Sequence, residues 1–188
     1  MSNLTVRDLE CIQNTLHDAG LDRYQLELDR GELTVMGPSD IVASEVTVRL
    51  TAFLFNWVTP RRLGRVCESA GGFILPDNSL KAPDVSFVKA DRLPRKIRYF
   101  AELVPDFVVE VKSQSDLVSK LEEKLLQFIE LGATVGLLVD PDLETVTVYR
   151  SRQENVVLDS SDTLTLPELF PGWELPVREI WPDVFEVE

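Results

Sequence analysis

Two charged residues, Glu110 and Lys112, interrupt an apolar segment that runs from Phe107 to Val111. Phenylalanine and valine favour a β-strand, and side chains two positions apart lie on the same face of a strand. A buried charge is costly unless it is paired or binds a metal. Two explanations are therefore open. Either this face of the strand is in water and the two side chains offset each other, or the charges have a chemical role.

A third charged residue, Asp84, lies in a second strand-like segment, 26 residues before Glu110. If the two strands are neighbours, Asp84 and Glu110 can converge on a divalent cation, which prefers oxygen ligands, and the Val111 carbonyl can add a third oxygen. Lys112 would then lie beside the attacking water, where it can orient or deprotonate it or offset developing negative charge. A solvent-facing aspartate after Pro83 is the structural alternative.

Apolar residues at helical spacing predict three helices that frame these strands. The second helix is expected to end before Pro60. The third is expected to begin at a capping box of Ser113 and Asp116, with Ser115 as the rival cap. The expected helices are about 6–19, the segment from 41 to Pro60, and the segment from 113–116 to Gly132.

The remaining segments predict a mixed β-sheet flanked by α-helices, in a single α/β domain over residues 1–188. Its expected parts are an N-terminal helix and hairpin over 1–37, a core over about 38–150 and a closing segment over 151–188. Expected strands are 24–29 and 32–36 as a hairpin, 65–76 with a bend at Gly71-Gly72, 82–90, the strand of Glu110, 134–140 and 144–150.

The net charge of −13 is concentrated in the second half of the chain. Residues 1–98 balance 13 basic against 13 acidic side chains, whereas residues 99–188 hold 6 basic and 19 acidic ones. Such a chain is not expected to bind nucleic acid through its overall field. Contacts to phosphate would have to come from local basic patches, which are otherwise solvated loops. The candidates are Arg61, Arg62 and Arg65, and the denser set Lys89, Arg92, Arg95, Lys96 and Arg98.

The composition argues against several other classes of protein. Two cysteines and one histidine, His17, do not make a disulfide framework, a zinc site or a Ser-His-Asp triad. No apolar run approaches the roughly 18 residues of a membrane span, and the N-terminus lacks the pattern of a signal peptide. We therefore expect a cytoplasmic protein without a membrane partner.

The segments APDVSF and VVEVK resemble the signature of the PD-(D/E)xK phosphodiesterases, the restriction-endonuclease-like nucleases. More specifically, five segments are similar, in this order, to the Uma-two family of bacterial endonucleases. The similarity runs from about residue 31 to residue 180. The segments are GELTVMGPSD, GFILPDNSLKAPDVSFV, VPDFVVEVKSQSD, KLLQFIELGA and LLVDPDLETVTVYR.

The resemblance implies a restriction-endonuclease-like core and assigns roles to individual residues. Asp84 and Glu110 would be ligands of Mg²⁺, with Mn²⁺ as a possible substitute, and Lys112 would be the catalytic lysine. Glu45 occupies the place of a glutamate that often completes such sites, although it can equally pair with Arg49 at i, i+4. Lys124 matches a basic position common in the family, although it is equally explained as an exposed helix charge.

The leading functional hypothesis is a divalent-metal-dependent endonuclease that hydrolyses phosphodiester bonds in DNA. RNA and a small phosphoester remain open as substrates, because the site chemistry would be the same. A homodimer is expected by analogy, since one site per chain favours two chains for cutting two strands. The alternative is a catalytically silent domain that serves as a nucleic-acid or protein interaction module.

Overall fold

A six-stranded mixed sheet forms the centre of the molecule in the computed structural model, which describes residues 4–21, 24–93 and 99–183. β7 and β8 are parallel, with α3 as the crossover between them, and the other neighbours are antiparallel. The prediction of a mixed sheet flanked by helices is confirmed. In sheet order the strands are β10 (Val156–Leu158), β9 (Thr145–Tyr149), β8 (Val135–Asp140), β7 (Phe107–Val111), β6 (Val85–Lys89) and β3 (Gly64–Glu68).

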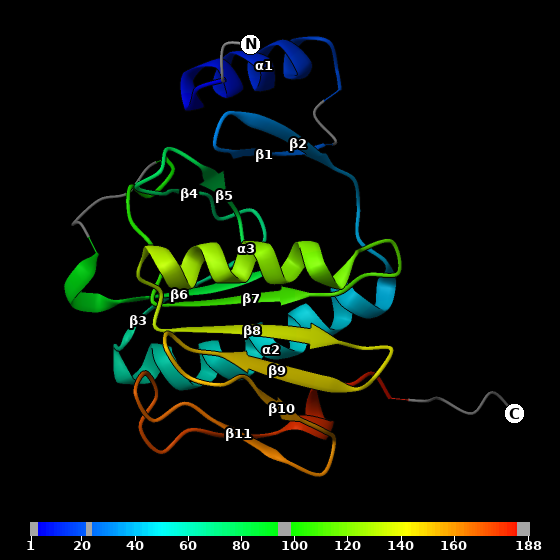
Figure 1. The fold of residues 1–188 in the computed structure, drawn as a ribbon, viewed down its shortest axis with the longest axis vertical. Coiled ribbons are helices and arrows are strands. Elements are labelled where there is room, and N and C mark those ends of the chain that lie inside the picture. The colour runs from blue at the N-terminus through cyan, green and yellow to red at the C-terminus, as the bar shows by residue number, and fades with distance from the viewer. Residues whose placement is uncertain (1–3, 22–23, 94–98, 184–188) are drawn as a thin grey trace, which may run out of the picture.

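Two long helices cover opposite faces of this sheet, α2 (Ile41–Arg61) and α3 (Val118–Leu131) (Figure 1). Alternation along β7 explains the division, because Phe107 and Val109 lie in the core on the α2 side and Val108 lies in the core on the α3 side. Even-numbered residues of β7 therefore face α3. Glu110 is one of them.

By length and composition alone, α2 is apolar enough to cross a membrane, the one such helix in the described residues. Its buried residues nevertheless pack on the sheet as those of a core helix do, and Glu45 and Arg49 lie within the same turns. The buried residues are Ala43, Val46, Leu50, Leu54 and Val58.

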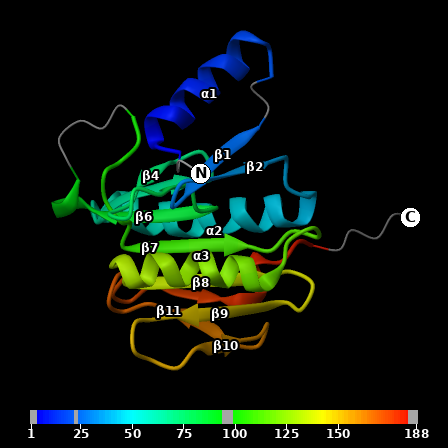
Figure 2. The same ribbon diagram turned by 45° about the horizontal axis from the view of Figure 1, so that its top comes forward.

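A second, four-stranded sheet lies at the N-terminal end of the molecule, beyond α3 and away from β9 and β10 (Figures 1 and 2). Here the segment predicted as one strand over 65–76 divides between the two sheets. β3 joins the central sheet, and the chain bends at Gly71-Gly72 before β4. In sheet order the strands are β2 (Glu32–Met36), β1 (Gln25–Asp29), β5 (Leu80–Lys81) and β4 (Phe73–Ile74), with α1 (Val6–Asp18) packed on β1.

The C-terminal segment packs its aromatic residues on the α2 side of the core. Phe170 meets Phe87 and Phe107 edge to face, with ring centroids 4.8 Å and 5.8 Å apart. This geometry suits the quadrupoles of the rings. The segment contains β11 (Thr163–Thr165), β12 (Glu174–Pro176) and the short helix η2 (Val177–Ile180).

Two predicted helix boundaries are wrong. α2 continues through Pro60, which lies in the last turn, and ends at Arg62 in the left-handed conformation. A proline there costs one backbone hydrogen bond just before the chain leaves the helix. α3 begins at Val118 without a side-chain cap. Asp116 does accept hydrogen bonds from Ser113, but they close a separate turn before the helix.

Candidate functional site

Asp84, directly before β6, and Glu110, in β7, lie at the same end of two paired strands. The antiparallel register matches Val85 with Val109, and its continuation by one residue would bring Asp84 opposite Glu110. Directly opposite side chains in such a pair have β-carbons about 4.5–5.5 Å apart. The backbone N–H of Val111 donates a 2.7 Å hydrogen bond to Asp84 Oδ2 and ties the two strand ends together. The condition on which the predicted site depended, neighbouring strands, is met.

Both carboxylates lie in surroundings that disfavour their charge. Glu110 is only 3 % exposed, and its Oε1 has no directed hydrogen bond. The pKa of Glu110 is raised to about 8, chiefly by burial and also by the carboxylates of Asp84 and Glu27, while Lys124 opposes the rise. Burial also raises the pKa of Asp84, against the hydrogen bond from Val111. A nearby cation would relieve this cost.

The cation closest to Glu110 is Lys124 on α3, not Lys112. The Lys124 ammonium lies 3.0 Å from Glu110 Oε1 and 2.9 Å from Glu27 Oε1 on β1. The 3.0 Å contact is an ion pair without the alignment of a hydrogen bond. Carboxylates on both sides raise the pKa of Lys124 although burial lowers it. Lys124 is thus a buried, paired cation rather than an exposed helix charge.

Glu27 was not among the predicted site residues, and its strand shows why. Alternation in β1 suggests that Glu27 faces away from Leu26 and Leu28 into solvent, but β1 is covered on both faces and Glu27 is 3 % exposed. For Lys124 a sequence signal did exist. Lys124 precedes the buried Leu125 and follows Leu121 by three positions, so it borders the face of the helix that packs on the sheet.

Lys112 and Glu45 have other partners. The Lys112 ammonium pairs with Asp142 in the turn after β8, and this contact raises the pKa of Lys112. Glu45 lies on α2, across the sheet from Glu110, and holds Arg49 at 2.8 Å in the i, i+4 pair. Arg49 in turn pairs with Asp183 at 2.8 Å. The structure therefore groups Asp84 and Glu110 with Lys124 and Glu27, and leaves Lys112 at the rim.

Comparison with known proteins agrees with this architecture. The profile of the family Uma2, described as "Putative restriction endonuclease", matches residues 15–178. The chain belongs to the Uma2 family. No curated protein matches it. Among solved structures, it is similar to a crystal structure described as a putative nuclease belonging to DUF820 from Anabaena variabilis, with a TM-score of 0.76 at 24 % identity. The match covers 82 % of this chain and 88 % of that one. At this identity the likeness shows the fold alone.

The donor set of this Uma2 protein fits a hard divalent cation such as Mg²⁺. Asp84 and Glu110 are neighbouring, largely buried carboxylates, and one Glu110 oxygen has no hydrogen bond. The Lys124 ammonium lies beside this Glu110 oxygen, so a positive charge is already accommodated there. As the side chains stand, no three of the described His, Cys, Asp or Glu residues are close enough together to hold a metal. The Lys124 ammonium accounts for this spacing, because it lies between Glu27 and Glu110.

The basic segment predicted to meet phosphate is only partly described. Arg95, Lys96 and Arg98 lie outside the described residues. Arg92 is held by Asp106 at 2.8 Å and by the Val104 carbonyl at 2.9 Å. Lys89 ends β6, and its backbone N–H donates to Asp106. In this Uma2 chain Asp106 therefore anchors the start of the basic segment.

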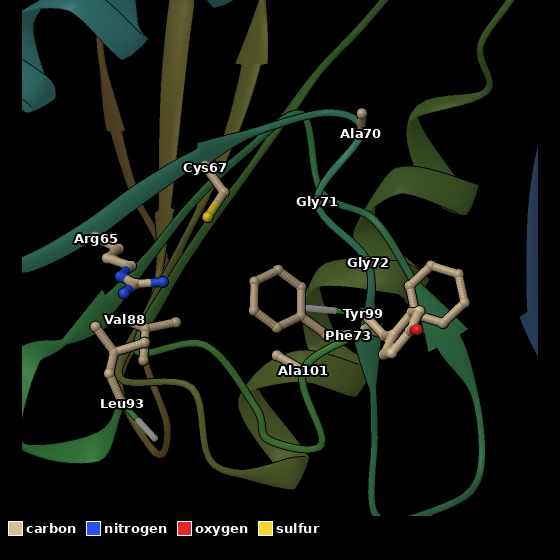
Figure 3. A pocket seen from close by; sticks show the side chains of 11 residues that line it. Arg65, Cys67, Ala70, Gly71, Gly72, Phe73, Val88, Leu93, Tyr99 and Ala101 are labelled. Atoms are coloured by element: carbon tan, nitrogen blue, oxygen red, sulfur yellow. The ribbon is translucent and has the colours of Figure 1, made fainter. Parts of the chain in front are cut away.

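A cleft of about 470 Å³ lies apart from the carboxylates, between β3 and the Gly71-Gly72 bend (Figure 3). Arg65 and Cys67 line one side of it. Burial raises the pKa of the Cys67 thiol, which therefore stays protonated and unreactive at neutral pH. The lining is mostly apolar and contains none of the predicted metal or catalytic residues, although Arg65 belongs to the first of the two predicted basic patches.

Proposed function

We propose that this protein is a divalent-metal-dependent endonuclease that hydrolyses phosphodiester bonds in DNA. The observation that carries the proposal is the pairing of β6 with β7, which brings Asp84 and Glu110 to the same strand end in a largely buried position. Membership of the Uma2 family supports a nuclease rather than another metal enzyme.

Asp84 and Glu110 would hold Mg²⁺ or Mn²⁺, with the Val111 carbonyl as a further oxygen. When bound, the ion would polarise the phosphodiester and neutralise charge that develops on it. The hydrogen bond from Val111 N–H fixes the orientation of Asp84. Lys112 would stay the cation nearest to incoming substrate, because its ammonium lies at the rim beside Asp142. In the absence of the ion, the Lys124 ammonium pairs with Glu110.

The direct test is incubation of the purified protein with labelled DNA and RNA in Mg²⁺, Mn²⁺ or EDTA. We expect cleavage of DNA that depends on the ion and is lost in Asp84→Asn and Glu110→Gln. Asp18→Asn is the matched control, because Asp18 is exposed at the end of α1 and belongs neither to the carboxylate cluster nor to the basic segment. Cleavage of RNA alone, or of a small phosphodiester alone, would change the substrate but not the chemistry.

Metal binding by itself should be visible as stabilisation. An ion that binds only the folded state contributes about 2.7 kcal/mol at 100-fold excess over its dissociation constant. We expect Mn²⁺ to raise the melting temperature of the wild type and not that of Asp84→Asn. Absence of both cleavage and any metal-induced shift would contradict the proposal.

The acidic surface favours a second candidate function, a silent interaction module. The excess of acidic residues over 99–188 repels nucleic acid, which suits a protein partner better than DNA. Binding of DNA or a protein without turnover in any metal would support it. A homodimer, proposed for cutting both strands, would appear as a doubled mass in light scattering.

A further inference from the structure

Three oxygen atoms surround the ammonium of Lys124. Glu27 Oε1 lies at 2.9 Å, Glu110 Oε1 at 3.0 Å, and the Ala82 carbonyl, which accepts a hydrogen bond, at 3.1 Å. The side chain of Lys124 is 13 % exposed and those of both glutamates 4 %. Carboxylate and carbonyl oxygens are the ligands that Mg²⁺, Mn²⁺ and Ca²⁺ take in proteins. The ammonium therefore occupies a position that suits a metal ion.

The charge around this position is unbalanced towards the negative. The carboxylates of Glu27, Asp84 and Glu110 all act on one another. Against these three stand Lys124 and the more distant Lys81, whose ammonium is 4.0 Å from Glu27 Oε2 and is shared with Asp29 at 3.3 Å. With every group ionised, the buried cluster keeps a negative charge that an additional positive charge would offset. Replacing the Lys124 ammonium by a doubly charged ion would supply this additional positive charge.

We propose that a divalent ion binds at this position by displacing the Lys124 ammonium, so that Glu27 is a third carboxylate of the metal centre. This deepens the proposed function and rests on it. Oxygens bind Mg²⁺ or Mn²⁺ at about 2.0–2.3 Å, whereas those around the ammonium stand at 2.9–3.1 Å. These three oxygens must close in by about 0.6–1.1 Å each. This explains why the described acidic side chains are not yet grouped tightly enough for a metal.

The placement of Glu27 makes the N-terminal sheet part of the site. Glu27 Oε1 also accepts a 2.8 Å hydrogen bond from the backbone N–H of Ala82, two residues before Asp84. Glu27 is therefore already fixed against the segment that carries Asp84. Lys124 sits at the end of a flexible four-carbon stem and can leave without any movement of α3.

Displacement is tested on the wild-type protein by acetylation of lysines, mapped by mass spectrometry, with and without Mn²⁺. Calorimetry establishes independently that Mn²⁺ is bound. We expect the labelling of Lys124 to increase several-fold on saturation with Mn²⁺. Lys120, exposed on the same helix, is the internal control and should not change. Bound Mn²⁺ with unchanged labelling of Lys124 would overturn the inference.

Variants test the same point through affinity. Lys124→Met and Lys112→Met remove one positive charge each, but only Lys124 occupies the proposed position. We expect Lys124→Met to bind Mn²⁺ at least about tenfold more tightly than Lys112→Met. Glu27→Gln added to Lys124→Met should cancel the gain. Removal of the Lys124 charge also strengthens proton binding by the same carboxylates, and protons compete with the metal. The gain in binding energy is nevertheless about twice as large for a divalent ion as for a proton, because the ion carries twice the charge.

The outcomes separate this inference from the proposed function. Equal Mn²⁺ affinity in Lys124→Met and Lys112→Met refutes the inference that the ion takes the position of the Lys124 ammonium. It leaves the proposed metal site of Asp84 and Glu110 intact. Binding by Lys124→Met but not by the wild type would mean that the lysine blocks the site and is not displaced, which refutes the inference. No binding by either refutes both. If Lys124→Met is unfolded without metal, recovery of its helical circular dichroism in Mn²⁺ is the supporting result, and failure to recover is the opposing one.

Discussion

Among the described carboxyls, Glu110 has the most strongly raised pKa, because burial disfavours its charged form. Its side chain is enclosed between β7, α3 and β1, and its pKa is raised to about 8. The folded protein therefore retains a proton that the unfolded chain releases near pH 4.5. The stability contributed by the protonated form is present below about pH 4.5 and is lost as the pH rises through about 8.

We expect Glu110→Gln to flatten this pH dependence. One retained proton changes the free energy of unfolding by at most about 1.4 kcal/mol per pH unit, so the wild type should lose on the order of a few kcal/mol between about pH 5 and pH 8. Urea unfolding without divalent ions measures it. Asp40, whose pKa is lowered by backbone hydrogen bonds, makes the folded protein more stable as the pH rises, but only at acid pH. Parallel slopes in the two proteins would contradict the assignment.

The two lysines should differ in their effect on stability. Lys124→Met leaves the Glu27 carboxylate buried without its nearest cation, which typically costs about 3–5 kcal/mol, whereas Glu110 is protonated at neutral pH. The Lys112 side chain is 14 % exposed, much like that of Lys124, but its partner Asp142 is 69 % exposed and stays hydrated without it, so Lys112→Met should cost less than about 1 kcal/mol. Chemical denaturation at neutral pH compares them. Equal losses would mean that the Lys124 pairs are as well solvated as a surface contact.

At the scale of elements, polar contacts add to the apolar packing of Phe73 and Leu75 in holding the N-terminal sheet to α3. Gln127 is 6 % exposed, and its side-chain amide donates to three groups of that sheet and its turn. These are Asp29 Oδ1 at 3.1 Å, Asp77 Oδ2 at 2.8 Å and Ser79 Oγ at 3.2 Å. These hydrogen bonds fix the position of β1, and therefore of Glu27, relative to the central sheet.

Replacement of Gln127 by leucine should loosen this attachment. The substitution keeps the size of the side chain but removes the donor to Asp29, Asp77 and the buried Ser79, at a cost of about 1–3 kcal/mol. Gln153→Leu, at an exposed position, is the control and should change little. Hydrogen exchange should rise first in β1 and β5 and much less in β7 and β8. Uniform loosening of both sheets would show that they unfold as one unit.

At the scale of the whole molecule, the negative field limits how nucleic acid can bind. Any affinity must come from a few local cations and should fall steeply with salt. We expect glutamine at Arg95, Lys96 and Arg98 to weaken DNA binding and to make the salt dependence shallower, with little change in melting temperature. The same substitution at Arg7, Arg152 and Arg178 changes the net charge equally and is the control. Equal weakening by both sets would make the effect one of net charge alone.

Local pattern was sufficient for much of this architecture. Alternation and helical spacing predicted the mixed sheet, and two carboxylates in strand-forming segments predicted Asp84 and Glu110 as candidates. These signals depend only on neighbours along the chain, because backbone geometry alternates side chains in a strand and repeats them in a helix. The ordered segments also resembled the Uma-two family, which the match over residues 15–178 confirms.

Only the tertiary structure decided which cations meet those carboxylates. Lys112 follows Glu110 at strand spacing, but β7 ends at Val111 and the side chain turns to Asp142. Lys124 reaches Glu110 from a helix that packs on the central sheet, and Glu27 reaches Lys124 from a hairpin of the N-terminal sheet; both elements are remote from Glu110 in sequence. Docking is determined by packing between segments far apart in the chain. A buried charge is placed by the partners that make its burial tolerable, and spacing along the chain does not reveal those partners.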